Sequence, residues 1–240
     1  MRGERASDER PHIWVGDTPW PVRLVPHAQS RRYRLVFDGA RGELRLTLPR
    51  RASAARAIKW ASEQQDWLAE QVGKAAAPVR VGPGTALPLF GMERRIEWTA
   101  TAPRAVRAEG DRLSVGGPAD TVGRRIERWL KAAALDIMTR ESREIAARAG
   151  LTVGRVGVGD PRSRWGSCTH DGDLRYSWRL VMAPDHVRRA TVAHEVAHLR
   201  HMDHSAAFHA LVEDLHDGDV GAARAWLRRE GRGLHRYRFT

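Results

Sequence analysis

The feature that most constrains this chain is a His-Glu-x-x-His motif at residues 194–198. Successive residues of a helix turn by ~100°, so His194 and His198 would lie one turn apart on one face. Two imidazoles at this spacing can bind one metal ion, and zinc takes neutral imidazole nitrogens at ~2.0–2.1 Å. Glu195 lies beside that face, where it could accept a proton from water without ligating the metal. A pair of histidines on a helix is more often solvated or part of the core, but the intervening glutamate favours a zinc site.

A catalytic zinc site needs a third protein ligand and an open fourth position. His204 falls at an expected helix boundary, where the chain can fold back on the metal, and Ser205 can cap the next helix. That helix has an apolar stripe at helical spacing: Phe208, Leu211, Val212 and Leu215. His201 is an alternative, because it would also point toward the site if the first helix ran straight. We favour His204 as the third ligand over His201.

The composition is that of a folded globular protein. Of the 240 residues, 42% are hydrophobic and 29% are charged. No apolar run reaches the ~18 residues that a membrane helix requires, and no apolar run follows the charged residues 1–10 as it would in a secretory signal. The single cysteine, Cys168, excludes an internal disulfide and favours a reducing compartment, so we expect a cytoplasmic protein without a membrane partner.

The chain is strongly basic, with 41 Lys and Arg against 29 Asp and Glu and a net charge of +12. Such a charge favours polyanionic partners, including nucleic acids. Residues 1–120 carry 20 basic and 14 acidic side chains and residues 121–240 carry 21 and 15, so each half has a charge of +6. Because there is no basic tail or block, the charge alone does not indicate where such a partner would bind.

The first half is predicted to be rich in strands. Apolar alternation indicates strands at residues 22–25, 33–37 and 43–48, arranged as an antiparallel hairpin or meander. Residues 53–74 are predicted to form one helix, with Trp60 and Trp67 packed on this sheet. Short strands follow at residues 94–98 and 108–115.

Gly116-Gly117-Pro118 is the expected domain boundary. It separates a β-rich region, residues 1–118, from a second domain at residues 119–240. A helix from Asp120 or Thr121 to about Ala149 would open this domain, with Gly150 as its stop. Residues 174–182 are strand-like, and Pro184 begins the helix that carries the His-Glu-x-x-His motif. The expected fold class is α+β.

The segment Arg162-Ser-Arg-Trp-Gly-Ser-Cys168 precedes this strand and is polar, aromatic and glycine-containing. Beside a metal site, such a segment can form an edge strand that pairs with an extended polypeptide, and a glycine permits close approach of the backbone. Arg164, Trp165 and Gly166 are therefore candidate substrate-binding residues, with the alternative that Trp165 is core and the arginines are solvated. Arg179 is a further candidate. Cys168 is expected to be a buried thiol rather than a nucleophile.

Several motifs together resemble one known family: Arg164-Trp-Gly-Ser-Cys168, Trp178-Arg-Leu180, Ala183-Pro184, Val192-Ala-His-Glu-Val-Ala-His-Leu199 and His204-Ser-x-x-Phe208. They resemble the YgjP-like zinc metallopeptidases, which are similar to the SprT-like group. The resemblance is strong over about residues 120–217 and looser before them. It implies a zincin-like catalytic domain with His194, His198 and His204 as zinc ligands and Glu195 as catalytic base. His209 departs from the family pattern, which usually has Trp there.

Three functions follow as hypotheses. The first is a zinc-dependent peptidase whose substrate is a polypeptide. The second is a nucleic-acid-associated protein with an arginine-rich surface, in which any proteolysis is directed at DNA-bound proteins. The third is a structural zinc module, which would need a fourth ligand such as His201.

Overall fold

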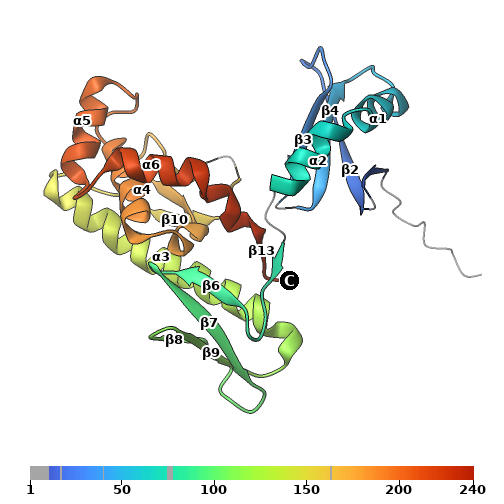
Figure 1. Ribbon diagram of the computed structural model, residues 1–240. Coiled ribbons are helices and arrows are strands. Elements are labelled where there is room, and N and C mark those ends of the chain that lie inside the picture. The colour runs from blue at the N-terminus through green and yellow to red at the C-terminus, as the bar shows by residue number, and fades with distance from the viewer. Residues whose placement is uncertain (1–10, 17, 40, 75–77, 163) are drawn as a thin grey trace, which may run out of the picture. The chain divides into compact units, whose positions relative to one another are not determined.

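The structure, a computed structural model, describes residues 11–16, 18–39, 41–74, 78–162 and 164–240. It divides the chain into two compact units, Met1–Pro78 and Val79–Thr240, coloured blue to teal and green to red in Figure 1. Each unit has its own cluster of buried apolar side chains. The division falls earlier in the chain than the boundary expected at residues 116–118. The reason is that the strands before Gly116 bury Leu87, Ile96 and Leu113 in the same core as the long helix that follows.

The first unit is a four-stranded sheet with two helices. Its strands are β1 (His12–Val15), β2 (Thr18–His27), β3 (Arg34–Asp38) and β4 (Glu43–Pro49), in the order β1-β2-β4-β3. The predicted hairpin of β3 and β4 is confirmed as antiparallel, but β2 pairs with β4 in parallel, so the predicted meander is wrong. The reason is that β4 lies between β2 and β3. The predicted helix is broken into α1 (Ala54–Ser62) and α2 (Gln65–Lys74).

Every second side chain of β4 contributes to the core of this unit. Leu44, Leu46 and Leu48 are buried on one face, where Ala57 of α1 and Leu68 of α2 cover them. Ser53 caps α1 by accepting a hydrogen bond from the backbone N–H of Arg56. Trp60 packs against this core as expected, whereas Trp67 remains 36% exposed.

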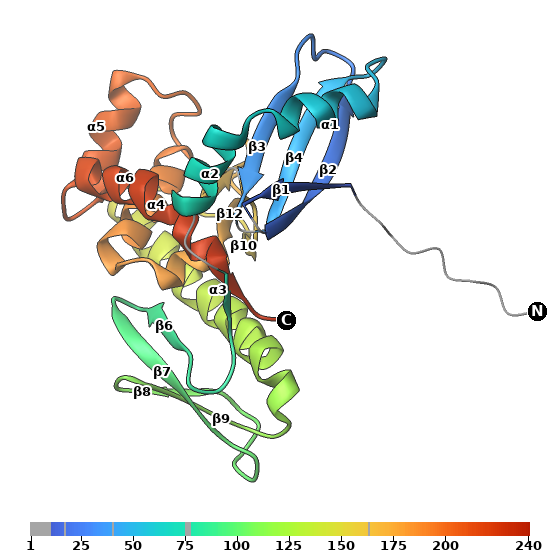
Figure 2. The same ribbon diagram turned by 45° about the vertical axis from the view of Figure 1, so that its right-hand side comes forward.

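The second unit begins with strands and a long helix. β5 (Val79–Arg80) pairs with β13 (Tyr237–Arg238) near the C-terminus. β6 (Ala86–Leu89), β7 (Met92–Thr99), β8 (Arg107–Glu109) and β9 (Arg112–Gly116) form a sheet in the order β6-β7-β9-β8. This sheet lies along α3 (Val122–Arg148), which follows the 3-10 turn η1 (Ala119–Thr121) (Figures 1 and 2). The helix ends at Arg148, and Gly150 follows as the predicted stop, with a φ of +64° that suits a residue without Cβ.

The rest of the unit is a small sheet covered by helices. β10 (Val156–Gly159), β11 (Gly166–Cys168) and β12 (Leu174–Ser177) pair in the order β10-β12-β11, so β11 is an edge strand. After a 3-10 turn, η2 (Trp178–Met182), come α4 (Asp185–Ala197), α5 (Ala206–Leu215), α6 (Val220–Arg229) and a second 3-10 segment, η3 (Gly231–Arg236). The architecture is α+β. Within the described residues, no helix is both long and apolar enough to cross a bilayer.

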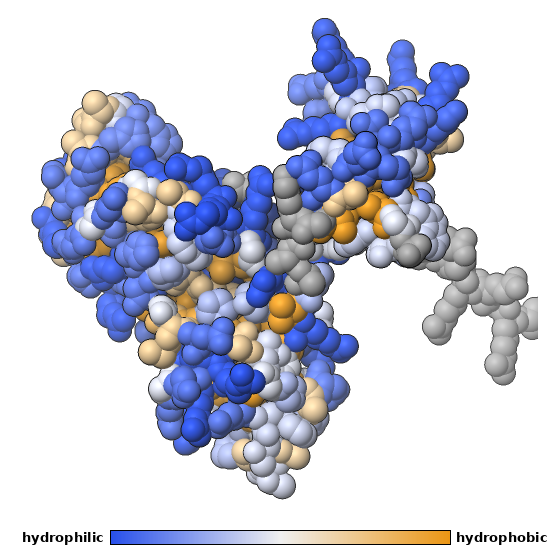
Figure 3. Space-filling model, viewed as in Figure 1, coloured by the Kyte–Doolittle hydropathy of each residue, from blue (hydrophilic) through white to orange (hydrophobic). Residues whose placement is uncertain are grey.

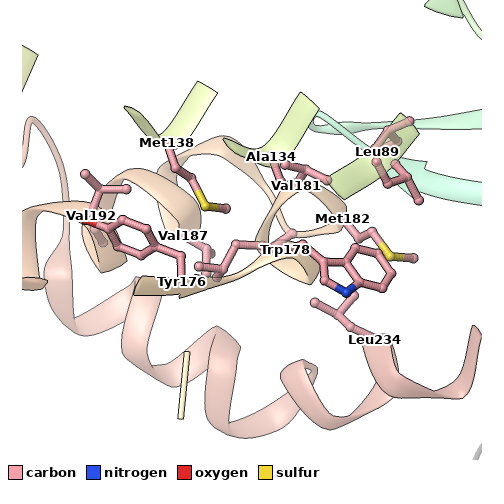
Figure 4. Close-up of a cluster of buried hydrophobic side chains, with 14 of the residues drawn as sticks. Leu89, Ala134, Met138, Tyr176, Trp178, Val181, Met182, Val187, Val192 and Leu234 are labelled. Carbon is pink, nitrogen blue, oxygen red and sulfur yellow. The ribbon is translucent and has the colours of Figure 1, made fainter. Parts of the chain in front are cut away.

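The predicted strand at residues 174–182 is only half right. The extended chain stops at Ser177, and η2 then turns so that Trp178 and Arg179 are both buried. A continuous strand would turn only one of these two neighbours into the core, whereas a 3-10 turn does not alternate as a strand does. Figure 4 shows the result, in which Trp178 and Tyr176 lie in one layer with Ala134 and Met138 of α3 and with side chains of α4.

Candidate metal centre

The site is built on α4, whose core-facing side fixes its orientation. Pro184 lies just before the helix, with φ −56° and ψ 147°, and Asp185 is acidic in the first turn. Val187, Val192 and Val196 are buried, so the helix packs along α3 and η2. His194 and Glu195 occupy the last turn, and His198 is the C-cap. One end of a well-packed helix therefore presents the motif.

The chain folds back after His198, and this brings His204 to the motif. Backbone hydrogen bonds from Arg200 and His201 to Ala197 tighten the turn. Ser205 then caps α5 by accepting a hydrogen bond from the N–H of Phe208 at 3.3 Å. The potential ligand atoms of His194, His198 and His204 all lie within 4.8 Å of one another, and the Nε2 atoms of His194 and His204 are 3.4 Å apart. The ring of His201 is not part of this cluster.

Phe208 forms the floor of the three-histidine cluster. Its fully buried ring stacks on His198, with centroids 4.5 Å apart, and meets His194 and His204 at its edge at 4.9 and 4.8 Å. The capped first turn of α5 fixes this ring. The imidazoles are therefore held against a rigid apolar surface, which limits their rotation.

A backbone group fixes the tautomer of His198. Its Nδ1 lies 2.9 Å from the carbonyl oxygen of His201, an acceptor, so Nδ1 donates and the Nε2 lone pair stays available for a metal. A carboxylate can also accept this hydrogen bond in a metal site, but Glu213 and Asp214 on α5 are both exposed. His201 thus belongs to the site through its main chain.

Burial shifts the pKa values of the motif in opposite directions. It lowers the pKa of His194 to about 4, with the neighbouring His198 and His204 adding to the effect. It also lowers the pKa of His198. For the carboxyl group of Glu195, burial raises the pKa to about 7, and the positive charge of Arg164 partly opposes this. Neutral imidazoles are the form that a metal requires.

A cleft of about 260 Å³ opens beside His194 and Glu195. Arg164, Trp165 and Gly166 line it, so the structure brings these three predicted residues to the motif. Gly166 is the first residue of the edge strand β11, and a Cβ there would lie 2.6 Å from Cγ of Glu195. Only glycine lets this backbone lie so close to the carboxylate.

Arg224 of α6 also lines the cleft, and no motif in the sequence singles it out. Its Nη2 donates to Nδ1 of His209 at 3.3 Å. The family pattern usually has Trp at the position of His209. In this chain the ring of His209 instead holds the guanidinium group of Arg224 at the cleft. The side chain of Arg224 is a candidate for binding an anionic group or a carbonyl oxygen.

Arg179 does not line the cleft. Its guanidinium is buried and donates to both carboxylate oxygens of Asp160, at 2.7 and 3.0 Å, and to the carbonyl oxygen of Leu234 at 2.8 Å. It thereby ties η3 to the loop after β10. On the cleft side of η3, Trp165 packs against Gly231 and lies 5.7 Å from the ring of His235. Arg179 therefore stabilises the segments that carry Asp160 and Leu234, and it does not make the substrate contact suggested by the sequence.

Cys168 shows no sign of an activated nucleophile. Burial, reinforced by the charges of Glu195 and Asp173, raises the pKa of its thiol to about 11. At neutral pH the sulfur is therefore protonated, and the thiolate rather than the thiol is the nucleophile. This agrees with the expectation that Cys168 is not a nucleophile, although its side chain is half-buried rather than buried.

A comparison with protein families gives a match for this chain. The model of the YgjP-like metallopeptidase domain aligns with residues 31–230, which is most of the chain. The chain belongs to the YgjP-like family. The match begins after β2, so it covers β3, β4, α1 and α2 of the first unit and the second unit as far as the end of α6. Comparisons with curated proteins and with solved structures give no match.

The donor set fits the metal that a YgjP-like metallopeptidase implies. Two nitrogens at 2.0–2.1 Å from a tetrahedral zinc would lie roughly 3.3–3.4 Å apart. The Nε2 atoms of His194 and His204 are 3.4 Å apart without an ion, so little movement would be needed. Within the described residues, the cluster offers three donors. Three ligands beside a cleft correspond to the catalytic type of zinc site, and a structural site would need a fourth.

Proposed function

We propose that the protein is a zinc-dependent peptidase with a zincin-like catalytic unit. The observation that carries the proposal is the convergence of His194, His198 and His204 beside the carboxylate of Glu195 in an open cleft. In this proposal the three imidazoles hold the zinc and Glu195 is the general base. The zinc would supply a Lewis acid that polarises a carbonyl group and lowers the pKa of water toward ~7.

The edge strand β11 supports a polypeptide as substrate. It pairs only with β12 in its sheet, through Gly166 opposite Tyr176, so its other edge is not covered by a described strand. An extended peptide can add to such an edge through main-chain hydrogen bonds. Gly166 lies against Glu195, so a peptide that is aligned on β11 would run past the proposed base.

The chain's own groups would then divide the work of hydrolysis. A carboxylate oxygen of Glu195 takes a proton from the attacking water and passes it to the leaving amine. Trp165 in the cleft wall and the buried ring of Phe208 against the histidines would limit the access of bulk water to the reacting groups. Arg224 lines the same cleft and would stabilise negative charge on the scissile carbonyl oxygen.

Replacement of Glu195 by Gln tests the proposal. The amide keeps the size of the side chain but cannot accept the proton, so we expect peptide hydrolysis to fall by roughly 10²–10⁴-fold while bound zinc stays near one per chain. Glu213→Gln, an exposed change on α5, is the matched control and should keep activity. His204→Ala should lose or loosen the metal. Full peptidase activity in Glu195→Gln would refute the assignment of the base.

A further inference from the structure

The two connections at one end of the first unit carry a concentration of arginine. Residues 27–34 and 49–59 contain seven basic side chains and no acidic one: Arg31, Arg32, Arg34, Arg50, Arg51, Arg56 and Lys59. Strand pairing explains why the connections lie together. His27 at the end of β2 lies opposite Pro49 at the end of β4, and Arg34 at the start of β3 lies opposite Thr47. The segments after β2 and after β4 therefore emerge at the same end of the sheet.

Two acidic side chains of this sheet, Asp38 and Glu43, lie at its opposite end. Asp38 and Glu43 face each other across the β3–β4 turn, where Glu43 pairs with Arg23 and Arg41. By contrast, Arg31, Arg32, Arg50 and Arg51 are exposed and form no ion pair with any described residue. We call these four residues the arginine end. Figure 3 shows strongly hydrophilic side chains gathered at this end of the unit, over the β2–β3 and β4–α1 connections.

An aromatic hollow opens within the arginine end. It has a volume of about 440 Å³ and is lined by Arg31, Arg32, Tyr33, Pro49, Ala52 and Trp60. The rings of Tyr33 and Trp60 are tilted by 48° with centroids 5.5 Å apart, and both are half-buried. A flat apolar ligand could therefore stack on a fixed aromatic wall while an anionic group meets the guanidinium groups.

From this arrangement we propose that the first unit binds single-stranded nucleic acid. A single strand offers phosphates for the arginine end and unpaired bases for the hollow of Tyr33 and Trp60, which is the combination that proteins use for such strands. A duplex would supply the phosphates but hide the faces of its bases, and an acidic peptide would leave the aromatic wall unused. The inference is independent of the proposed hydrolysis, because none of these residues belongs to the metal centre.

The first test compares two double substitutions in the full-length protein. Arg31→Gln with Arg32→Gln removes two charges from the arginine end. Arg124→Gln with Arg128→Gln removes two exposed charges from α3 and serves as the matched control. Binding of a fluorescently labelled 20-nucleotide oligo(dT) is measured by anisotropy over a range of salt concentrations. Each phosphate contact contributes about 0.7 to the log–log salt slope of a single strand, so the first variant should flatten it by roughly 1.4 and bind more than about tenfold more weakly at 0.1 M salt.

The control variant should keep the wild-type slope and affinity. An equal loss in the two variants, or none in the first, would overturn the proposal. Tyr33→Leu tests the hollow separately: it keeps an apolar side chain against Trp60, and we expect several-fold weaker binding with an unchanged salt slope. Circular dichroism checks that each variant is folded.

Competition identifies the class of ligand. Unlabelled oligo(dT) should displace the probe at lower concentration than duplex DNA, heparin or poly-glutamate at equal concentration of charge. Heparin or poly-glutamate as effective as oligo(dT) would show a general polyanion surface and overturn the proposal, and stronger competition by the duplex would do the same. Peptidase activity of the Arg31→Gln/Arg32→Gln variant on a short peptide should be unchanged.

Discussion

Gly166 shows how one missing Cβ can shape the candidate site. The position lies at the start of the edge strand, where a methyl group would come within 2.6 Å of Cγ of Glu195 and 2.7 Å of its carboxyl carbon. The backbone of Gly166 does not have a positive φ, so alanine fits the strand itself. The requirement for glycine therefore comes from the neighbouring carboxylate alone.

We expect Gly166→Ala to displace Glu195 and to leave the histidines in place. A shift of about 1 Å in a reacting group can cost roughly 100-fold in rate, so kcat should fall by one to two orders of magnitude while zinc content stays unchanged. Gly157→Ala on β10 is the matched control, because a Cβ there meets nothing within 4 Å. Steady-state kinetics and metal analysis of both variants check the prediction. Wild-type kcat in Gly166→Ala would mean that the carboxylate can move without loss of function.

The residues of the site differ in how far sequence could predict them. His194 and His198 were predictable because helical spacing is local, and His204 because Ser205 indicates a helix start. Arg224 was not, since its approach depends on how α6 packs on α4. The role of the His201 carbonyl group could not be predicted either. Every residue has such a group, and this one reaches His198 only because the chain folds back after α4.

At the scale of elements, a buried ion pair joins α4, the helix that carries the His-Glu-x-x-His motif, to α3. Arg188 of α4 donates to both carboxylate oxygens of Glu141, at 2.9 and 3.1 Å, and to Asp185 at 2.6 Å. Arg188 and Glu141 are each 3% exposed. Burial opposes the charge of Arg188, but the hydrogen bonds and charges of Glu141 and Asp185 outweigh it and raise its pKa. The pair fixes how α4 is rotated against α3, and so where the motif points.

Removing one partner of this pair should destabilise the second unit strongly. Glu141→Gln leaves the buried guanidinium of Arg188 with only the exposed Asp185 as a counter-charge. Loss of a buried partner typically costs about 3–5 kcal/mol in the free energy of unfolding. The double variant Glu141→Leu/Arg188→Met should lose much less, because no unpaired charge remains. Glu144→Gln, which removes the exposed partner of Arg189, is the control and should cost no more than about 1 kcal/mol. Urea unfolding measures all three. If Glu141→Gln and Glu144→Gln cost the same, the buried pair has no special structural role.

Helices and strands could be predicted from the sequence where nearby residues mark their ends. α3 was expected to end before Gly150, and it does, because a glycine with positive φ stops a helix. The turn η2 was missed, since Trp178–Met182 is an apolar run that reads as a strand. Its conformation is set by packing against α3, which a local pattern does not contain.

At the scale of the whole molecule, the chain has two cores, and the predicted boundary at residues 116–118 misplaced the division between them. Glycine and proline there mark only the passage from β9 into η1. What decides the grouping is long-range burial, because Leu113 and Val115 pack with Ile126 in the second core. The family match over residues 31–230 nevertheless includes β3, β4 and both helices of the first unit, so the matched YgjP-like domain spans the division between the two units.

Because the two units have separate cores, we expect zinc binding to affect the unfolding of each unit differently. All three histidines of the cluster lie in the second unit, so zinc should stabilise that unit's unfolding transition and leave that of the first unit unchanged. At free zinc of 100 times its dissociation constant, binding adds about 2.7 kcal/mol, which corresponds to a rise of roughly 5–10 °C in Tm for a unit of this size. Differential scanning calorimetry with zinc and with a chelator measures the shift of each transition. His204→Ala should abolish most of it, whereas His186→Ala, an exposed histidine on α4, should not. A zinc-dependent shift that survives in His204→Ala would place the metal elsewhere, and an equal shift of both transitions would show that the two units unfold as one.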